Sequence, residues 1–196
     1  MLTSPSHVVW QAIGEHGPSP GTSSWTLDNR PLPFLVMRGE ELMPELLHNA
    51  IWASRRERRH EPTLLHLAAA YSLDDTDAVD AARIPVERVG SPILFLSGDA
   101  DALWPSTAMA GAAQRARVTA GIARADEHRH YPNAGHLIRM PYQPTQAQWT
   151  SGIAFGGTPA GLAAAEADAG QQTLRFLASH LGRGTELSAS ITTPDT

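Results

Sequence analysis

The chain has 196 residues, of which 42% are hydrophobic and 18% are charged, and its formal net charge is −5. This length and composition predict one soluble globular domain with a sizeable core and exclude a disordered chain. The negative charge gives no reason to expect a nucleic acid as partner. The absence of cysteine excludes disulfides, thiolate zinc sites and a cysteine nucleophile within these residues.

Targeting and membrane segments are not visible in the sequence. The amino-terminal residues lack the basic region and the apolar core of a signal peptide, and no stretch approaches the roughly 18 consecutive apolar residues of a spanning helix. We therefore expect a cytoplasmic protein with no membrane partner. The small, polar stretch 183–196 is expected to be disordered.

The amino-terminal part contains few strand-like runs. A short apolar run covers 7–13, and the stretch 14–34, rich in Gly, Pro and Ser, is expected to be a loop. Apolar residues at helical spacing predict helices over 40–55 and 61–73. A further short helix is expected to begin at Thr76, with this residue as its N-cap.

The carboxyl-terminal part alternates strands and helices. The apolar run 92–98 ends in a turn signal, which is typical of a strand buried on both faces of a parallel sheet, although periodicity alone does not exclude a helix. An Ala-rich helix is expected over 105–118, and a second strand within 127–136. A long helix over 158–182 is predicted to be capped by Thr158 and closed by its last glycine.

This order favours an α/β fold with parallel strands. Only two convincing strands and one partial strand are visible, which is too few for a sheet that is covered on both sides. We therefore predict an incomplete sheet, in which 15–83 forms an insertion and 84–182 forms the core.

Two strand ends carry titratable residues. Asp99 and Asp101 follow the first strand, and His136 follows the second, at the carboxyl ends where functional groups collect in open α/β sheets. An Asp–His pair on adjacent loops can serve a nucleophilic hydrolase, because the carboxylate fixes the tautomer of the imidazole and stabilises the imidazolium. Each residue alone is explained by a turn or a structural role, but their ordered pairing favours catalysis. Asp99, directly after Gly98, is the weaker candidate.

Three stretches are specific enough to compare with known families: IPVERVGSPILFLSGDADALWPSTAMA, HYPNAGHLIRMPY and FGGTPAGLAAAEADAGQQTLRFLASHL. They resemble the C-terminal catalytic domain of the acyl-CoA thioesterases and bile-acid-CoA:amino-acid N-acyltransferases, which are α/β-hydrolases. The stretches SPSHVVWQ and SSWTLDNRPLPF are similar to the part of that family just after its nucleophile strand, so the resemblance covers roughly 2–182. It implies a partial α/β-hydrolase domain over 1–182, in which 15–83 is lid-like. It also implies that Asp101 is the triad acid and His136 the base, because Gly-x-x-Asp-x-x-Trp-Pro selects Asp101.

The resemblance further implies a Ser or Cys nucleophile on an elbow upstream of SPSHVVW, and the printed sequence contains neither this elbow nor its oxyanion donors. The amino-terminal β-sandwich of that family is also absent from it. A Gly-x-Ser-x-Gly match at 17–21 would make Ser19 the nucleophile. We reject it, because Pro20 has no backbone N–H to donate to an oxyanion and no helical pattern follows.

The resemblance implies an acyl-CoA hydrolase or acyltransferase, with a coenzyme A thioester as substrate and neither a metal nor a redox cofactor. The rival interpretations are a truncated, non-catalytic product that binds a partner, and a disrupted gene or wrongly chosen start codon. Because the sheet lacks the strand that should flank SPSHVV, we expect an exposed apolar edge and self-association of the isolated chain.

Four further features leave alternatives open. Trp104 either lines the mouth of a pocket or simply packs. His128 and His130 are more readily explained as a pair on one strand face than as metal ligands. The basic run 55–60 is interpreted as a solvated face rather than as a site for the phosphates of coenzyme A. Gly170 stands inside the last helix, where that family tends to carry an aromatic residue, at a cost of about 1 kcal/mol relative to Ala.

Overall fold

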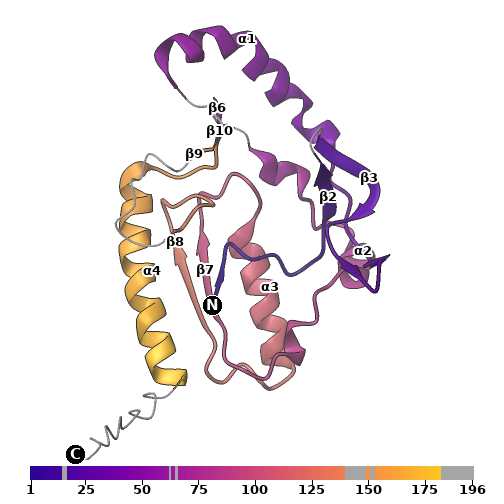
Figure 1. Cartoon of the computed structure of the whole chain (residues 1–196), viewed down its shortest axis with the longest axis vertical. Helices are drawn as coiled ribbons and strands as arrows, with labels where there is room; N and C mark the ends of the chain where they lie inside the picture. Colours follow the sequence, from indigo (N-terminus) through magenta and orange to yellow (C-terminus); the bar gives the residue numbers. More distant parts are fainter. Residues whose placement is uncertain (15–16, 62, 65, 140–148, 151–152, 182–196) are drawn as a thin grey trace, which may run out of the picture.

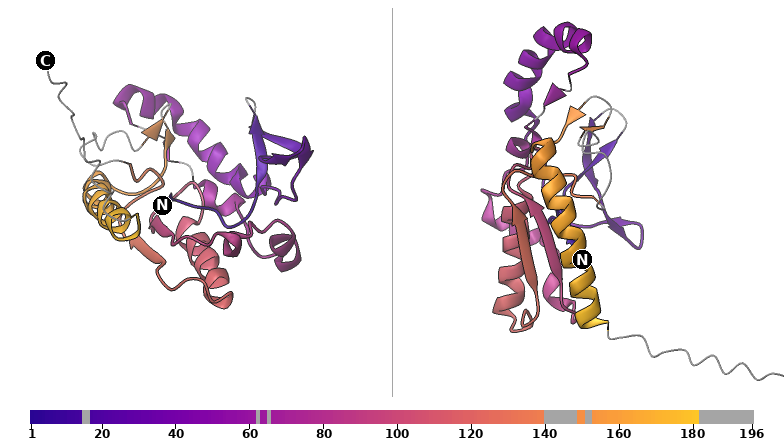
Figure 2. Two further views of the ribbon diagram at one scale, coloured as in Figure 1. Left: turned by 60° about the horizontal axis from the view of Figure 1, so that its bottom comes forward. Right: turned by 90° about the vertical axis from the view of Figure 1, so that its left-hand side faces the viewer.

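A central parallel sheet lies between two helices in the computed structural model (Figures 1 and 2). Its strands lie in the order β1-β7-β8, and both neighbouring pairs are parallel. The predicted α/β fold with parallel strands is therefore confirmed. The strands are β1 (Leu2–Thr3), β7 (Leu94–Gly98) and β8 (Glu127–Tyr131). The structure describes residues 1–14, 17–61, 63–64, 66–139, 149–150 and 153–181.

Strand β7 is buried on both faces, as its sequence predicts. Leu94 and Leu96 belong to an apolar cluster with Ala165 of helix α4, whereas Phe95 packs with Ala110 of helix α3. Because successive side chains of a strand point to opposite faces, the two helices cover opposite sides of the sheet (Figure 2). They are α3 (Ser106–Thr119) and α4 (Pro159–His180).

The helix predicted over 40–55 is present as α1 (Met43–Arg59) and extends away from the sheet beyond the carboxyl ends of its strands (Figure 1). A second small sheet near it has the strand order β6-β10-β9. Within the described residues, no helix is long and apolar enough to cross a bilayer. The remaining short elements are β6 (Thr63–Leu64), β9 (Trp149–Thr150), β10 (Ile153–Ala154), and the 3-10 helices η1 (Gly39–Leu42), η2 (Leu67–Ala70) and η3 (Val86–Arg88).

One of the two predicted N-caps is correct. The hydroxyl of Thr158 accepts a hydrogen bond from the N–H of Gly161 at 3.0 Å and caps α4. Helix α2 (Thr76–Ala81) is capped instead by Asp75, whose carboxylate accepts a backbone hydrogen bond at 3.0 Å. The prediction of Thr76 is wrong because the carboxylate one position earlier satisfies the first turn.

The helix predicted over 61–73 is wrong. The segment contains the short strand β6 and the single 3-10 turn of η2. Its backbone bonds to another part of the chain, since the N–H of Ala68 donates to the carbonyl of Ala102 at 3.1 Å. Such long-range bonds replace the local ones that an α-helix would use.

The loop predicted over 14–34 is also wrong, because two hairpins occupy this part of the chain. The second hairpin turns at Asp28 and Asn29, whose φ angles of +50° and +61° are typical of a two-residue hairpin turn. The expectation of a loop rested on the content of Gly, Pro and Ser, and it overlooked the Asp-Asn pair as a turn signal. The hairpin strands are β2 (Gln11–Gly14), β3 (Gly17–Ser23), β4 (Thr26–Leu27) and β5 (Arg30–Pro31). The glycine expected to close α4 and the stretch 183–196 lie outside the described residues.

A buried arginine ties α3 to the segment before β7. Arg117 is fully buried, and it donates to both carboxylate oxygens of Asp126, at 2.5 and 3.0 Å. Its guanidinium also donates to the carbonyls of Val86, Val89 and Ser91, at 2.6–2.8 Å. These bonds use the fork of donors that only arginine offers.

We expect Arg117→Met to lower the free energy of unfolding by about 3–5 kcal/mol, because a buried carboxylate loses its cation and three carbonyls lose a donor. Urea denaturation measures this change. The matched control is Arg115→Met on the exposed side of the same helix, for which a change below about 0.5 kcal/mol is expected. A similar small change for Arg117→Met would contradict the structural role.

Two histidines within the fold have a lowered pKa. Burial, with the charges of Arg115 and Arg83, lowers the pKa of His7 from its ordinary 6.5. Burial, followed by the charge of His130, lowers the pKa of His128. In both cases the folded state favours the neutral imidazole, whereas the unfolded chain binds the proton more readily.

The free energy of unfolding should therefore fall as the pH decreases through about 6.5, because the unfolded state then binds more protons than the folded state. In His7→Leu this decrease should be smaller than in the unsubstituted protein. Urea denaturation near pH 7.5 and pH 5.5 measures the decrease in the unsubstituted protein and in the variant. The control is His60→Asn, a substitution at an exposed residue, in which the free energy of unfolding should keep its original pH dependence. If His7→Leu also kept that pH dependence, the burial of His7 would not contribute to it.

Candidate functional site

The loops that follow β7 and β8 pack backbone against backbone. A Cβ at Gly98 would overlap the carbonyl oxygens of Ala134 and Gly135, and a Cβ at Gly156 would overlap the carbonyl of Ala100. Gly156 also has a φ of +85°, which favours glycine. The close approach brings together the carboxyl ends of the two strands, where the candidate residues lie.

Asp101 and His136 form a hydrogen-bonded pair in this contact. Oδ2 of Asp101 lies 3.0 Å from Nδ1 of His136, and their side chains are 2% and 15% exposed. Oδ1 of Asp101 accepts hydrogen bonds from the backbone N–H groups of Leu103 and Trp104, at 2.9 and 3.2 Å. Two backbone donors therefore orient the carboxylate, which in turn orients the imidazole that it contacts.

Two hydrogen bonds fix the backbone of His136, and a tryptophan ring packs against its imidazole. The backbone N–H of His136 donates to the carbonyl of Phe155 at 3.1 Å, and the backbone carbonyl of His136 accepts from the hydroxyl of Ser4 at 2.6 Å. The Trp104 ring lies edge-on at 4.9 Å between centroids. Within the described chain, Nε2 has no hydrogen-bond partner. The arrangement leaves this nitrogen able to exchange a proton with a third group.

Sequence reasoning missed Ser4, the residue directly after β1. Ser4 is buried and has a φ of +44°, which is uncommon for a residue other than glycine. Its carbonyl accepts a hydrogen bond from Nε1 of Trp104 at 3.1 Å, in addition to the bond of its hydroxyl to His136. The only signal in the sequence is the Ser-Pro pair at positions 4 and 5.

Asp99 belongs to a second pair, separate from the first. Its Oδ2 lies 2.9 Å from Nδ1 of His130, and its Oδ1 accepts from the hydroxyl of Thr107 at 2.9 Å. Burial alone would raise the pKa of Asp99, but the hydrogen bonds of His130 and Thr107 lower it. His128 bonds to Ser97 at 2.9 Å. Both histidines therefore have hydrogen-bond partners on β7 or directly after it, and the described residues contain no group of three potential metal ligands.

Ser19 does not lie on a nucleophile elbow. It lies within β3, the second strand of a hairpin, whereas an elbow joins a strand to a helix. This geometry agrees with its rejection as nucleophile.

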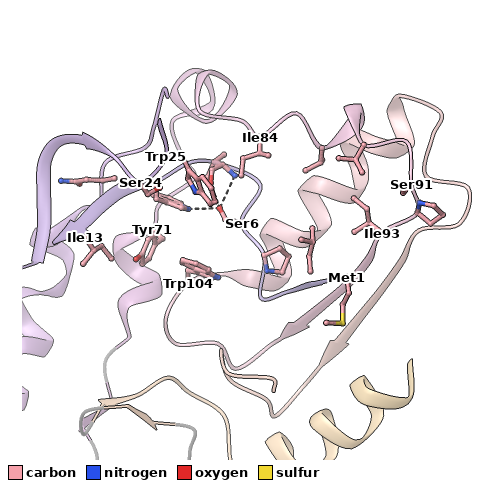
Figure 3. Close-up of a pocket in the computed structure, with 18 residues that line it drawn as sticks. Met1, Ser6, Ile13, Ser24, Trp25, Tyr71, Ile84, Ser91, Ile93 and Trp104 are labelled. Carbon is pink, nitrogen blue, oxygen red and sulfur yellow. Dashed lines mark hydrogen bonds between the residues drawn. The ribbon is translucent and has the colours of Figure 1, made fainter. Parts of the chain in front are cut away.

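Trp104 lines an apolar cavity of about 800 Å³ beside β1 (Figure 3). The cavity also contacts Met1, Leu2, Ile84 and Ile93, on the side of the sheet that α3 covers. Trp104 packs as well, with Tyr71 at 5.7 Å between ring centroids, so both interpretations of this residue apply. A second apolar cavity, of about 400 Å³, lies on the α4 side of β1. It is lined by Met1, Leu96, Ile138, Gly170 and Leu174, among others.

Comparison with known proteins identifies the family. Residues 34–183 match the family described as "BAAT / Acyl-CoA thioester hydrolase C terminal". Human acyl-coenzyme A thioesterase 1 and human mitochondrial acyl-coenzyme A thioesterase 2 are each 39% identical over 104 residues, and mouse peroxisomal succinyl-coenzyme A thioesterase is 32% identical over 104 residues. Each match covers 50% of this chain but only 21–24% of the relative. The chain belongs to the BAAT / acyl-CoA thioester hydrolase C-terminal family.

Proposed function

We propose that this chain supplies the acid–base half of an α/β-hydrolase that transfers acyl groups from coenzyme A thioesters to water or to an amine. The observation that carries the proposal is the buried Asp101–His136 pair, at 3.0 Å, at the carboxyl ends of parallel strands. Relatives named acyl-CoA thioesterases support the substrate class. The nucleophile is a Ser or Cys outside these 196 residues.

In this mechanism His136 moves the protons. Its Nε2 accepts the proton of the nucleophile, which attacks the thioester carbonyl, and then returns that proton to the departing coenzyme A sulfur. A water or amine next attacks the acyl-enzyme while Nε2 accepts its proton, and the nucleophile leaves with that proton. Asp101 keeps the Nδ1–H tautomer and stabilises the imidazolium in both steps. No step requires a metal or a redox cofactor.

The proposal assigns 1–182 to the C-terminal part of a hydrolase domain, with 15–83 as a lid-like region over the core 84–182. We also propose a cytoplasmic location from the sequence alone. Family membership does not determine location, since relatives bear mitochondrial and peroxisomal names.

The edge at β1 is where the missing nucleophile strand would pair. Within the described residues, β1 pairs only with β7, and the two apolar cavities flank it on opposite sides of the sheet. A further strand with apolar neighbours would fill these spaces. The carboxyl end of such a strand would lie beside Ser4, which contacts His136.

The opposite edge of the sheet has a different character. On β8, Arg129 is exposed and forms an ion pair with Glu127 at 2.9 Å, and charged side chains are a usual protection of a natural edge. The β1 edge instead presents Met1 and Leu2, which are 54% and 39% exposed. This asymmetry supports a missing neighbour at β1 rather than at β8.

We expect the 196-residue chain alone to show no acyl-CoA hydrolysis above background, and the protein translated with its upstream coding sequence to be active. In that longer protein, His136→Asn should lower kcat on the order of 10⁴-fold. Release of coenzyme A thiol measures the reaction. The 196-residue chain has no cysteine, so in the test of that chain alone the protein adds no thiol to the signal.

The matched control is His130→Asn, which removes the imidazole of the other Asp–His pair and should change kcat less than about twofold. Activity of the short chain that disappears in both Ser19→Ala and His136→Ala would make Ser19 the nucleophile. An inactive longer protein would favour a non-catalytic binding fragment.

We also expect the isolated chain to self-associate through the β1 edge. Leu2→Lys should shift it toward the monomer in analytical ultracentrifugation, because a charge on an edge strand opposes pairing. Leu181→Lys, at an exposed residue just after α4, is the control and should leave the distribution unchanged. A monodisperse, cooperatively folding monomer of the unsubstituted chain would contradict the prediction.

A further inference from the structure

Helix α1 is attached to the rest of the molecule through polar groups. It extends beyond the carboxyl ends of the sheet (Figure 1), and among its residues only Asn49 is buried. The carboxylate of Glu45 accepts a hydrogen bond from the backbone N–H of His66 at 3.0 Å. Glu45, Asn49 and Arg56 occupy the side of α1 that is partly or fully covered.

The apolar side of α1 faces solvent. Met43, Leu47 and Ile51 follow one another at intervals of four residues and therefore share one side of the helix. Their exposed fractions are 51%, 61% and 76%, and Leu46 beside them is 41% exposed. A surface helix normally buries its apolar side against the core. Helix α1 instead directs its apolar side toward solvent, where this side can bind a partner.

Basic residues continue this side toward the end of the helix. Arg55, Arg58 and Arg59 lie four, seven and eight residues after Ile51, so they project near it. The guanidinium of Arg55 lies 5.5 Å from the centre of the Trp52 ring. These arginines stand on a chain whose net charge is −5, so the basic character is local.

Two acidic residues accompany these arginines but do not neutralise them. Glu57 lies on the same helix, and Glu61 follows it and pairs with Arg59 at 3.8 Å. The three arginines of this side stand against two glutamates, Glu57 and Glu61, which leaves a formal excess of one positive charge. A partner that suits α1 therefore combines apolar and anionic character.

We propose that the apolar–basic face of α1 binds an anionic lipid surface. This face consists of Met43, Leu46, Leu47, Ile51, Arg55, Arg58 and Arg59. An amphipathic helix with Leu and Ile on one side and arginines beside them lies in the plane of a lipid interface, with its apolar residues among the acyl chains and its cations at the headgroups. Charge complementarity selects this occupant, since the faces of two copies would bring like charges together and a nucleic acid would leave the apolar residues unpartnered.

The test uses vesicles of phosphatidylcholine alone and of phosphatidylcholine with about 30% phosphatidylglycerol. Because the chain has no cysteine, Ile51→Cys carries a polarity-sensitive fluorophore at one defined position of the face. We expect co-sedimentation and a blue-shifted emission with the anionic vesicles only. Both should weaken as salt is added, because salt screens the arginines.

Two variants test the two halves of the face. Leu47→Gln with Ile51→Gln removes apolar contact and should abolish detectable binding. Replacing Arg55, Arg58 and Arg59 by Gln should lower the partition coefficient about fivefold per residue, or roughly 100-fold in total. The control is Val118→Gln on α3, whose exposed fraction of 61% equals that of Leu47, and it should bind as the unsubstituted chain does.

Several results would overturn the proposal. These are equal binding to neutral vesicles, binding that survives both variants, or self-association that disappears in Leu47→Gln with Ile51→Gln. Binding of adenosine 3′,5′-bisphosphate that requires the three arginines, without vesicle binding, would assign them instead to the nucleotide of coenzyme A. Lipid binding does not depend on hydrolysis, so it can succeed or fail independently of the proposed reaction.

Discussion

The candidate site depends on the contact between the two loops that follow β7 and β8. Gly98 and Gly156 allow carbonyl groups of neighbouring loops to occupy the space that a side chain would fill. Only at this separation does Oδ2 of Asp101 reach Nδ1 of His136. Hydrogen bonds from the backbone of His136 to Phe155 and Ser4 then fix the position of this residue, so the site is built from four separate parts of the chain.

The sequence predicted the elements whose patterns are local and long. Strand β7 is a continuous apolar run, and α3 and α4 carry helical spacing over several turns. The rule that parallel strands end at one edge of a sheet was then sufficient to place Asp101 beside His136, although their catalytic role stays a prediction. The same rule could not separate Asp101 from Asp99, which has its own histidine partner; the family spacing selected Asp101.

The errors arose where tertiary contacts outweigh local pattern. The segment 61–73 has the apolar spacing of a helix, but a backbone bond from Ala68 to Ala102 holds its central turn in another conformation. The role of Ser4 depends on contacts with residues about 100 and 132 positions away, which no local pattern reveals. Helix α1 was predicted correctly, yet periodicity states only that the apolar residues share a side, and not which side faces the body.

The β1 edge and the apolar side of α1 both lack a partner among the described residues. The chemistry of each surface indicates which kind of partner it can bind. The β1 edge offers unpaired backbone groups and apolar cavities on both sides, which suits another strand of polypeptide. Helix α1 offers exposed apolar side chains with arginines beside them, which suits a lipid interface. The expectation of no membrane partner was drawn from the absence of a spanning run, and a helix that lies on a surface needs no such run.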